Sequence, residues 1–211
     1  MKNRRILMSL IGVVLCGISV GIYRFAALGV DPFTSLVIGM DGVIPLSYGT
    51  VYALVNLVLL SFALVTDRSK IGLATFINLF LLGYIADGSY MVLNGLNSAP
   101  GMVLRLTALL IGTGLLCLSL ALYITADLGV STYDAVGIVA AEQWHLASFG
   151  VCRIVTDIGC LLIGVLLCRI SAGSFAGISS IVGVGTVLTA FCMGPMIEFF
   201  SKTIARPLLN R

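Results

Sequence analysis

The chain has 211 residues, of which 59% are apolar and only 10% are charged. Soluble domains carry roughly 25% charged residues, so a water-soluble globule of this composition would expose large apolar patches. The net charge is only +3 and the basic residues are scattered, which argues against a nucleic acid as a partner. The composition therefore predicts a multi-pass protein of the lipid bilayer.

Six apolar stretches are long enough to cross a bilayer, and they must be helices because lipid offers no partner to unpaired backbone groups. Two further apolar pieces, about 31–43 and 131–144, are too short to cross. With the N-terminus inside, six crossings place eight basic residues on the cytoplasmic side and three outside, in line with the positive-inside rule. We therefore predict that both termini are cytoplasmic. The six stretches are 6–24, 48–66, 71–91, 102–124, 149–168 and 179–200.

The sequence repeats itself after about 100 residues. Residues 5–34 align with residues 105–134 with eleven identities in thirty positions, among them Arg5 with Arg105. The two copies, 1–100 and 101–211, each contain three predicted crossings. Because three is odd, the second copy must lie inverted in the membrane. Beyond residue 134 the alignment pairs Asn56 with Asp157, Gly72 with Gly183, Thr75 with Thr186 and Asp87 with Glu198.

Each short apolar piece follows a helix-start signal. Asp31 precedes Pro32, and Ser131 precedes Thr132, so both pieces have a capping residue. Such non-spanning pieces are tolerated in a membrane where they pack within protein or line a wet cavity. The sequence thus predicts an all-α membrane protein of six transmembrane helices, arranged as two inverted three-helix repeats. Each repeat has a half-helix after its first span, which is a plan typical of transporters.

Ionisable residues inside the spans are the candidates for a site, because each costs about 2.5 to 3.5 kcal/mol at a helix centre. Asp157 lies nine residues into the fifth span, and Arg153 precedes it by one helical turn. The pair either binds substrate or a proton, or it is a buried structural ion pair. The full set of candidate substrate-binding residues is Gly29, Asp31, Thr34, Asn56, Gly129, Ser131, Thr132, Asp134, Arg153 and Asp157.

Other polar residues have simpler explanations. Asp87 and Glu198 lie near the ends of the third and sixth spans, where we expect them to be solvated among the headgroups. Tyr23 and Tyr123 also lie near span ends, where aromatic residues usually anchor the interface; a stacking surface for substrate is the alternative.

No pattern of a cofactor, a metal site or an enzyme is found. The six cysteines lie in apolar stretches without a CxxC pair, and the chain has no Walker loop, nucleophile elbow or HExxH motif. We therefore expect no catalytic residue, metal or cofactor. The small-xxx-small spacings Gly17/Gly21 and Gly173/Gly177 suggest a homodimer.

Four segments, 27–34, 47–50, 71–83 and 182–195, resemble the YczE/YitT-like bacterial membrane proteins. The similarity covers nearly the whole chain. It implies an integral protein of the bacterial plasma membrane, but it brings no substrate and no catalytic residue.

From these patterns we expect a secondary permease for an unidentified small solute, bound at the repeat interface near the bilayer midplane. A non-transporting scaffold or regulator of a partner protein is the alternative. A carrier and a channel have the same sequence features, so this choice stays open, as do the substrate, the coupling ion and the direction of transport.

Overall fold

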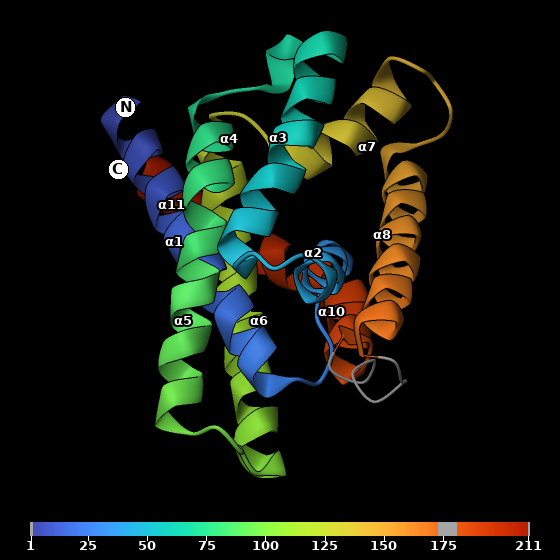
Figure 1. Ribbon diagram of the computed structural model, residues 1–211. Helices are drawn as coiled ribbons and strands as arrows, with labels where there is room; N and C mark the ends of the chain where they lie inside the picture. The colour runs from blue at the N-terminus through green and yellow to red at the C-terminus, as the bar shows by residue number, and fades with distance from the viewer. Residues whose placement is uncertain (1, 173–180, 211) are drawn as a thin grey trace.

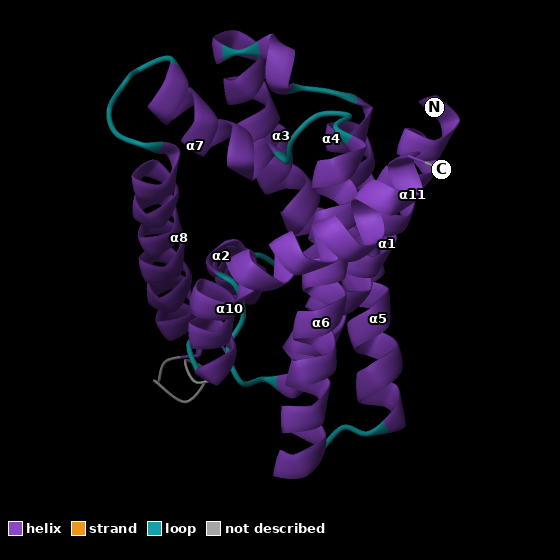
Figure 2. Cartoon of the chain, turned by 180° about the vertical axis from the view of Figure 1, so that it is seen from behind, coloured by secondary structure: helices purple, strands orange, loops and turns teal. Residues whose placement is uncertain are grey.

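The protein is described by a computed structural model over residues 2–172 and 181–210, and every regular element in those ranges is helical (Figures 1 and 2). Two π-helical turns, Asn78–Leu82 and Ser201–Ala205, join α4 to α5 and α10 to α11. The α-helices are α1 (Lys2–Ala26), α2 (Pro32–Val43), α3 (Tyr48–Thr66), α4 (Leu73–Ile77), α5 (Gly83–Leu96), α6 (Met102–Ala126), α7 (Thr132–Glu142), α8 (Phe149–Ala172), α10 (Val184–Phe200) and α11 (Arg206–Asn210).

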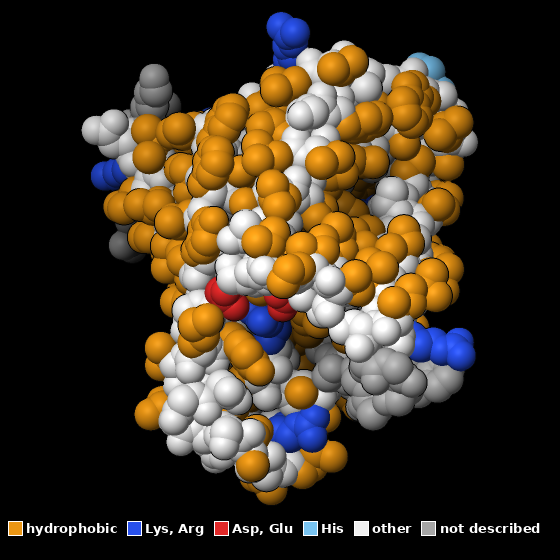
Figure 3. Space-filling view, viewed as in Figure 1, with side chains coloured by type: hydrophobic (Ala, Val, Ile, Leu, Met, Phe, Trp, Pro, Cys, Tyr) orange, Lys and Arg blue, Asp and Glu red, His pale blue; other side chains and the backbone are white. Residues whose placement is uncertain are grey.

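Among the described residues, five helical stretches are long and apolar enough to cross a membrane, which confirms five of the predicted spans to within a few residues. Apolar side chains cover most of the face seen in Figure 3, as expected of a surface that lies in lipid. The chain is therefore a helical, multi-pass membrane protein. The five stretches are Asn3–Ala26, Tyr48–Thr66, Leu73–Leu96, Met102–Ala126 and Val151–Ser171.

The sixth predicted span, 179–200, differs from the observed helix. α10 begins at Val184 and has 17 residues, about 26 Å at 1.5 Å per residue, which is shorter than the roughly 30 Å of a bilayer core. Residues 179 and 180 lie outside the described part of the chain. The helical path continues from α10 through the second π-helical turn into α11. Six crossings thus stay a prediction.

The two short helices form where the capping signals predict them. The Asp31 carboxylate accepts a hydrogen bond from the Thr34 amide at 3.0 Å, and Pro32 occupies the first helical position of α2. Ser131 caps α7 in the same way, since its hydroxyl accepts from the Asp134 amide at 3.0 Å. With 12 and 11 residues, the helices are about 18 Å long or less and cannot cross a bilayer.

Helices α1 and α6 pack along each other at the centre of the fold. Each has an arginine near its start, as its fourth residue, that reaches the C-terminal end of the other helix. Arg105 donates hydrogen bonds to the carbonyl oxygens of Ala26 and Ala27, and Arg5 lies 3.6 Å from the Asp127 carboxylate just beyond α6. The two helices are therefore antiparallel.

The loop before α2 crosses the beginning of α10. Gly29 has a φ of +102°, and a Cβ there would lie 2.6 Å from the Gly183 amide nitrogen, so the close approach and the backbone conformation both require glycine. The Thr186 hydroxyl donates to the Val30 carbonyl at 2.9 Å. The Gly185 amide donates to the Leu28 carbonyl of the same loop at 2.8 Å. A loop of the first half is thus held by a helix of the second.

The equivalent contact exists with the halves exchanged. Gly129, before α7, has a φ of +111°, and a Cβ there would lie 2.5 Å from the Gly72 amide nitrogen. The Thr75 hydroxyl donates to the Val130 carbonyl at 2.6 Å. We call these two contacts the threonine clamps. The alignment of the halves pairs Thr75 with Thr186 and Val130 with Val30, so the two clamps consist of equivalent residues.

The Gly17/Gly21 spacing is occupied within the chain. A Cβ at Gly17 would lie 2.7 Å from the Ile85 side chain, and one at Gly21 would lie 2.5 Å from that of Ser89. The small residues therefore let α5 approach α1, so this spacing is used within the chain, and the homodimer stays a prediction. The second spacing, Gly173/Gly177, falls outside the described residues.

Candidate functional site

A cavity of about 130 Å³ lies where the first turns of α2 and α7 meet the central helices. It is lined by residues of both halves of the chain. Six of the predicted site residues line it: Asp31, Thr34, Asn56, Ser131, Asp134 and Arg153. Other lining residues are Val13, Cys16, Phe33, Tyr52, Asn78, Ser119, Tyr123, Tyr133 and Met193.

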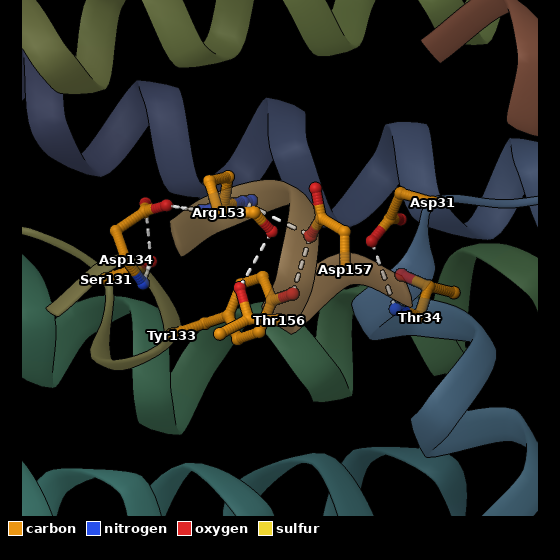
Figure 4. Close-up of polar contacts among 8 residues, drawn as sticks. All are labelled: Asp31, Thr34, Ser131, Tyr133, Asp134, Arg153, Thr156 and Asp157. Atoms are coloured by element: carbon orange, nitrogen blue, oxygen red, sulfur yellow. Dashed lines mark hydrogen bonds and ion pairs between the residues drawn. The ribbon is translucent and has the colours of Figure 1, made fainter. Parts of the chain in front are cut away.

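The Arg153 guanidinium is the centre of an ion-pair cluster at the wall of this cavity (Figure 4). Its Nε lies 3.2 Å from Asp157 Oδ1, as the spacing of one helical turn predicts. A second nitrogen pairs with the Asp134 carboxylate of α7, which the sequence alone did not pair with it. The guanidinium also lies over the Tyr133 ring, 4.4 Å from its centroid. One arginine thus joins α7 to α8.

Aromatic side chains missed by the sequence reasoning form another part of the wall. Tyr133 donates from its hydroxyl to Asp157 Oδ1 at 2.5 Å, and its ring stacks on Phe33, with centroids 4.8 Å apart. Tyr52 meets Phe33 edge to face at 5.7 Å and donates to Asn78 Oδ1 at 2.8 Å. The signal that would have found the stack is the alignment of the two halves, because it pairs residue 33 with residue 133.

Asp31 is placed between two cavities. It lines the first and also a second cavity, of about 360 Å³, together with Arg153 and Asp157. One oxygen of its carboxylate accepts the capping hydrogen bond from Thr34. In the view of Figure 4, the Asp157 carboxylate lies between the Arg153 guanidinium and Asp31, and all three residues line the second cavity.

The remaining predicted residues have backbone or packing roles. Thr132 is buried and donates to Asn56 Oδ1, so it ties α7 to α3 without lining the cavity. Asn56 in turn donates to the Tyr52 carbonyl at 2.8 Å. Gly29 and Gly129 lie in the threonine clamps, and neither of them lines the first cavity.

The two tyrosines expected at the membrane interface are buried, which corrects that prediction. Tyr23 is 3% exposed and shares a hydrogen bond of 2.6 Å with Thr113. Tyr123 is 6% exposed and lines the cavity. Its hydroxyl has no hydrogen-bond partner among the described residues. The alignment explains the difference, because Val13 stands in the first half where Thr113 stands in the second.

Asp87 is also buried, where we expected solvation at the interface. It lies 3.1 Å from Arg24, whose guanidinium is held between the rings of Tyr48 and Tyr90 at 4.1 and 4.5 Å. Asp41 of α2 lies 4.0 Å from the same guanidinium. In Figure 3, acidic and basic side chains meet in a hollow of the apolar face. The partner of Asp87 in the alignment, Glu198, is largely exposed and pairs with Lys202.

Within the described ranges, no three His, Cys, Asp or Glu side chains converge as metal ligands do. Besides the ion pairs, the first cavity offers hydroxyl and amide groups from Thr34, Ser119 and Asn78, and four aromatic rings. Such a site can bind a small polar solute by hydrogen bonds, charge and ring contacts.

Residues 3–202 match the family of unknown function DUF6198. The chain belongs to this family. A relative in Haemophilus influenzae, described as an uncharacterized protein, is 30% identical over 141 residues, which cover 66% of this chain and 57% of that protein. The chain thus matches less than two thirds of the length of this curated relative. No solved structure matches the chain. The YczE/YitT-like name stays a prediction.

Proposed function

We propose that the protein is a secondary permease that carries a small solute through a binding site between its two halves. The observation that carries the proposal is the cavity at the first turns of α2 and α7, with the Arg153 ion pairs at its wall. Charged side chains are costly in lipid, and inside membrane proteins they commonly mark solute or ion pathways. A cleft or cavity lined mainly by apolar groups, with a few convergent polar groups, is the usual form of a small-molecule site.

The proposal includes the inverted arrangement of the two halves. The threonine clamps are reciprocal, since the first half holds a loop of the second and the second holds the equivalent loop of the first. Arg5 and Arg105 are likewise each placed at the far end of the other half's first helix. Exchanged contacts of this kind are expected of two units related by a two-fold axis. The antiparallel packing of α1 and α6 fits an axis in the membrane plane.

The short helices fit the role of discontinuous helices in transporters. Their capped N-terminal turns meet at the cavity, and backbone that ends within the bilayer is tolerated where it lines a cavity or packs in protein. We assign Gly29 and Gly129 to the loops that hold these turns in place. The solute would contact Asp31, Thr34, Asp134 and the aromatic wall.

For orientation, we propose six crossings with both termini in the cytoplasm of a bacterial cell. The two described ends of the chain lie at the same end of the molecule in both views (Figures 1 and 2). This proposal predicts that Ser69 is cytoplasmic and Ser98 is external. Single cysteines at these positions, in a cysteine-free variant, should react with a membrane-impermeant thiol reagent from opposite sides. Labelling from the same side would contradict the arrangement.

The transport test uses purified protein in liposomes and a panel of labelled small metabolites. We expect saturable uptake of at least one solute, reduced at least tenfold by Asp157→Asn. Glu198→Gln is the matched control, because it removes a carboxylate whose ion pair is largely exposed. Absence of saturable flux for every solute, together with co-purification of a stoichiometric partner, would favour a scaffold or regulator. Uptake that is unchanged by Asp157→Asn would make the ion pair a structural one.

A further inference from the structure

We infer that the solute of this cavity is a small organic cation, held by the carboxylate of Asp31. The inference rests on the proposed permease function for its physiological meaning, but the binding itself can be tested without transport. Four independent features of the cavity lead to it: the excess of carboxylates, an unpaired hydroxyl, the aromatic wall and the size.

The carboxylates of the site outnumber its cations. Three carboxylates line the two cavities, those of Asp31, Asp134 and Asp157. The described lining includes one guanidinium, that of Arg153. The guanidinium pairs with Asp134 and Asp157. For Asp31 the contact present in the described residues is the capping hydrogen bond from the Thr34 amide. A carboxylate with no cationic partner among the described side chains attracts a cation, so the charge of the site favours a positive solute.

A buried hydroxyl provides the second feature. Tyr123 lines the same cavity as Asp31, is 6% exposed, and has no hydrogen-bond partner for its hydroxyl in the described chain. Leaving a buried polar atom without a hydrogen-bond partner is unfavourable, so a ligand group that bonds to this hydroxyl is stabilised by the bond. The hydroxyl oxygen can accept a hydrogen bond from the N–H of an ammonium group. This favours a primary or secondary amine over a quaternary one.

The aromatic wall is the third feature. Phe33, Tyr52 and Tyr123 line the cavity, and aromatic faces attract cations, the more so as water is excluded. Tyr133 already holds the Arg153 guanidinium over its ring in this way. The rings also provide apolar surface for the carbon skeleton of the solute.

Size limits the solute further. The cavity of about 130 Å³ is close to the roughly 150 Å³ that accommodates one benzene molecule in an engineered apolar cavity. A solute of about five or six non-hydrogen atoms would fill it. A bare metal ion fits the site less well, because the described carboxylates do not converge as metal ligands do.

The test compares three ligands of nearly equal shape: isobutylammonium, neutral isobutanol and the anion isobutyrate. Purified protein in detergent is titrated with each, and binding is followed by calorimetry and by the shift in thermal unfolding. We expect isobutylammonium to bind and to raise the unfolding temperature, while the neutral and anionic analogues do neither. A wider ammonium series, from methylammonium to tetraethylammonium, should show an optimum at four to six non-hydrogen atoms.

Two variants separate the site from the fold. Asp31→Asn should weaken ammonium binding at least tenfold while the protein stays folded, because asparagine caps a helix about as well as aspartate. Tyr123→Phe should weaken the binding of primary amines several-fold and leave the affinity for tetramethylammonium unchanged. Asp127→Asn is the control, because this carboxylate is largely exposed beyond α6. This variant should bind isobutylammonium with the affinity of the native protein.

The inference is overturned if isobutanol or isobutyrate binds as well as isobutylammonium, if Asp31→Asn keeps full affinity, or if no member of the ammonium series binds. Saturable uptake of a neutral or anionic solute would keep the permease and reject the cation. Ammonium binding that depends on Asp31, without flux in liposomes, would keep the cation site and reject the permease.

Discussion

The ring of Phe33 stacks on the ring of Tyr133, with the two planes 28° apart. The two residues occupy the same position in the alignment of the halves, the second residue of a short helix. Their next neighbours also correspond: Tyr52 meets Phe33, and Arg153 meets Tyr133. The centre of the molecule thus contains the same pair of contacts in each half. In the first half the ring meets a neutral side chain, Tyr52, and in the second it meets a charged one, Arg153.

Tyr133→Phe tests that difference directly. The variant gives both halves the same ring, so the stack should persist, while the hydrogen bond to Asp157 is lost. A hydrogen bond to a charged group contributes about 1.5–3 kcal/mol. We expect a lower unfolding temperature by scanning calorimetry and a several-fold loss of solute uptake. An uptake rate equal to that of the native protein would mean that the hydroxyl only supports the fold.

Removal of either threonine clamp should destabilise the protein, whether the threonine belongs to the first half or to the second. Thr75→Val and Thr186→Val each remove the donor to a loop carbonyl, at a cost of about 1–3 kcal/mol per clamp. The unfolding temperature should fall by a similar amount in both variants. Thr203→Val is the control, because its hydroxyl bonds within its own helix on an exposed surface. A large loss in one variant with none in the other would argue against equivalent clamps.

Gly29→Ala and Gly129→Ala should both be severely destabilising. A left-handed backbone costs a residue with a Cβ roughly 1–2 kcal/mol, and the added carbon would collide with backbone of the other half at 2.6 and 2.5 Å. Yield of monodisperse protein after detergent extraction and its unfolding temperature provide the measurement. Gly114→Ala, in α6 with open space beside it, should be neutral or stabilising. Equal behaviour of all three variants would refute the assignment.

Arg24→Lys should not replace the native side chain. The guanidinium lies between two tyrosine rings while it pairs with Asp87, and an ammonium group has neither the planar shape nor the same donor geometry. We expect a loss of about 1–2 kcal/mol, the upper range for desolvated cation–ring contacts, by thermal unfolding. Arg68→Lys, at an exposed arginine that bonds to the Leu64 carbonyl near the end of α3, is the matched control and should change little.

Features set by neighbours along the chain could be predicted from the sequence. The start of α2 depends on Asp31 and Pro32, which are adjacent, and the Arg153–Asp157 contact depends on one helical turn. The alignment of the halves also paired each residue of one threonine clamp with its equivalent in the other, Thr75 with Thr186 and Val30 with Val130, although it gave no reason to expect that the threonines touch the loops.

Features set by helix packing could not be predicted in this way. Asp134 and Arg153 belong to different helices, and so do Arg24 and Asp87. Hydropathy placed Tyr23 near the end of its span, but burial depends on which face of α1 meets α6, and a strongly apolar helix has little contrast between its faces. The cavity likewise arises where several helices meet.

The clamp between Thr186 and Val30 spans 156 residues of sequence, whereas the clamp between Thr75 and Val130 spans 55. During synthesis, therefore, the Val30 carbonyl in the loop after α1 cannot receive its hydrogen bond from Thr186 until almost the whole chain has left the ribosome. A nascent chain truncated before α10 would lack Thr186, so this carbonyl would have no hydrogen bond from it in the bilayer. Such a fragment should be a substrate for quality-control proteolysis, because incompletely assembled chains expose surface that the finished fold covers.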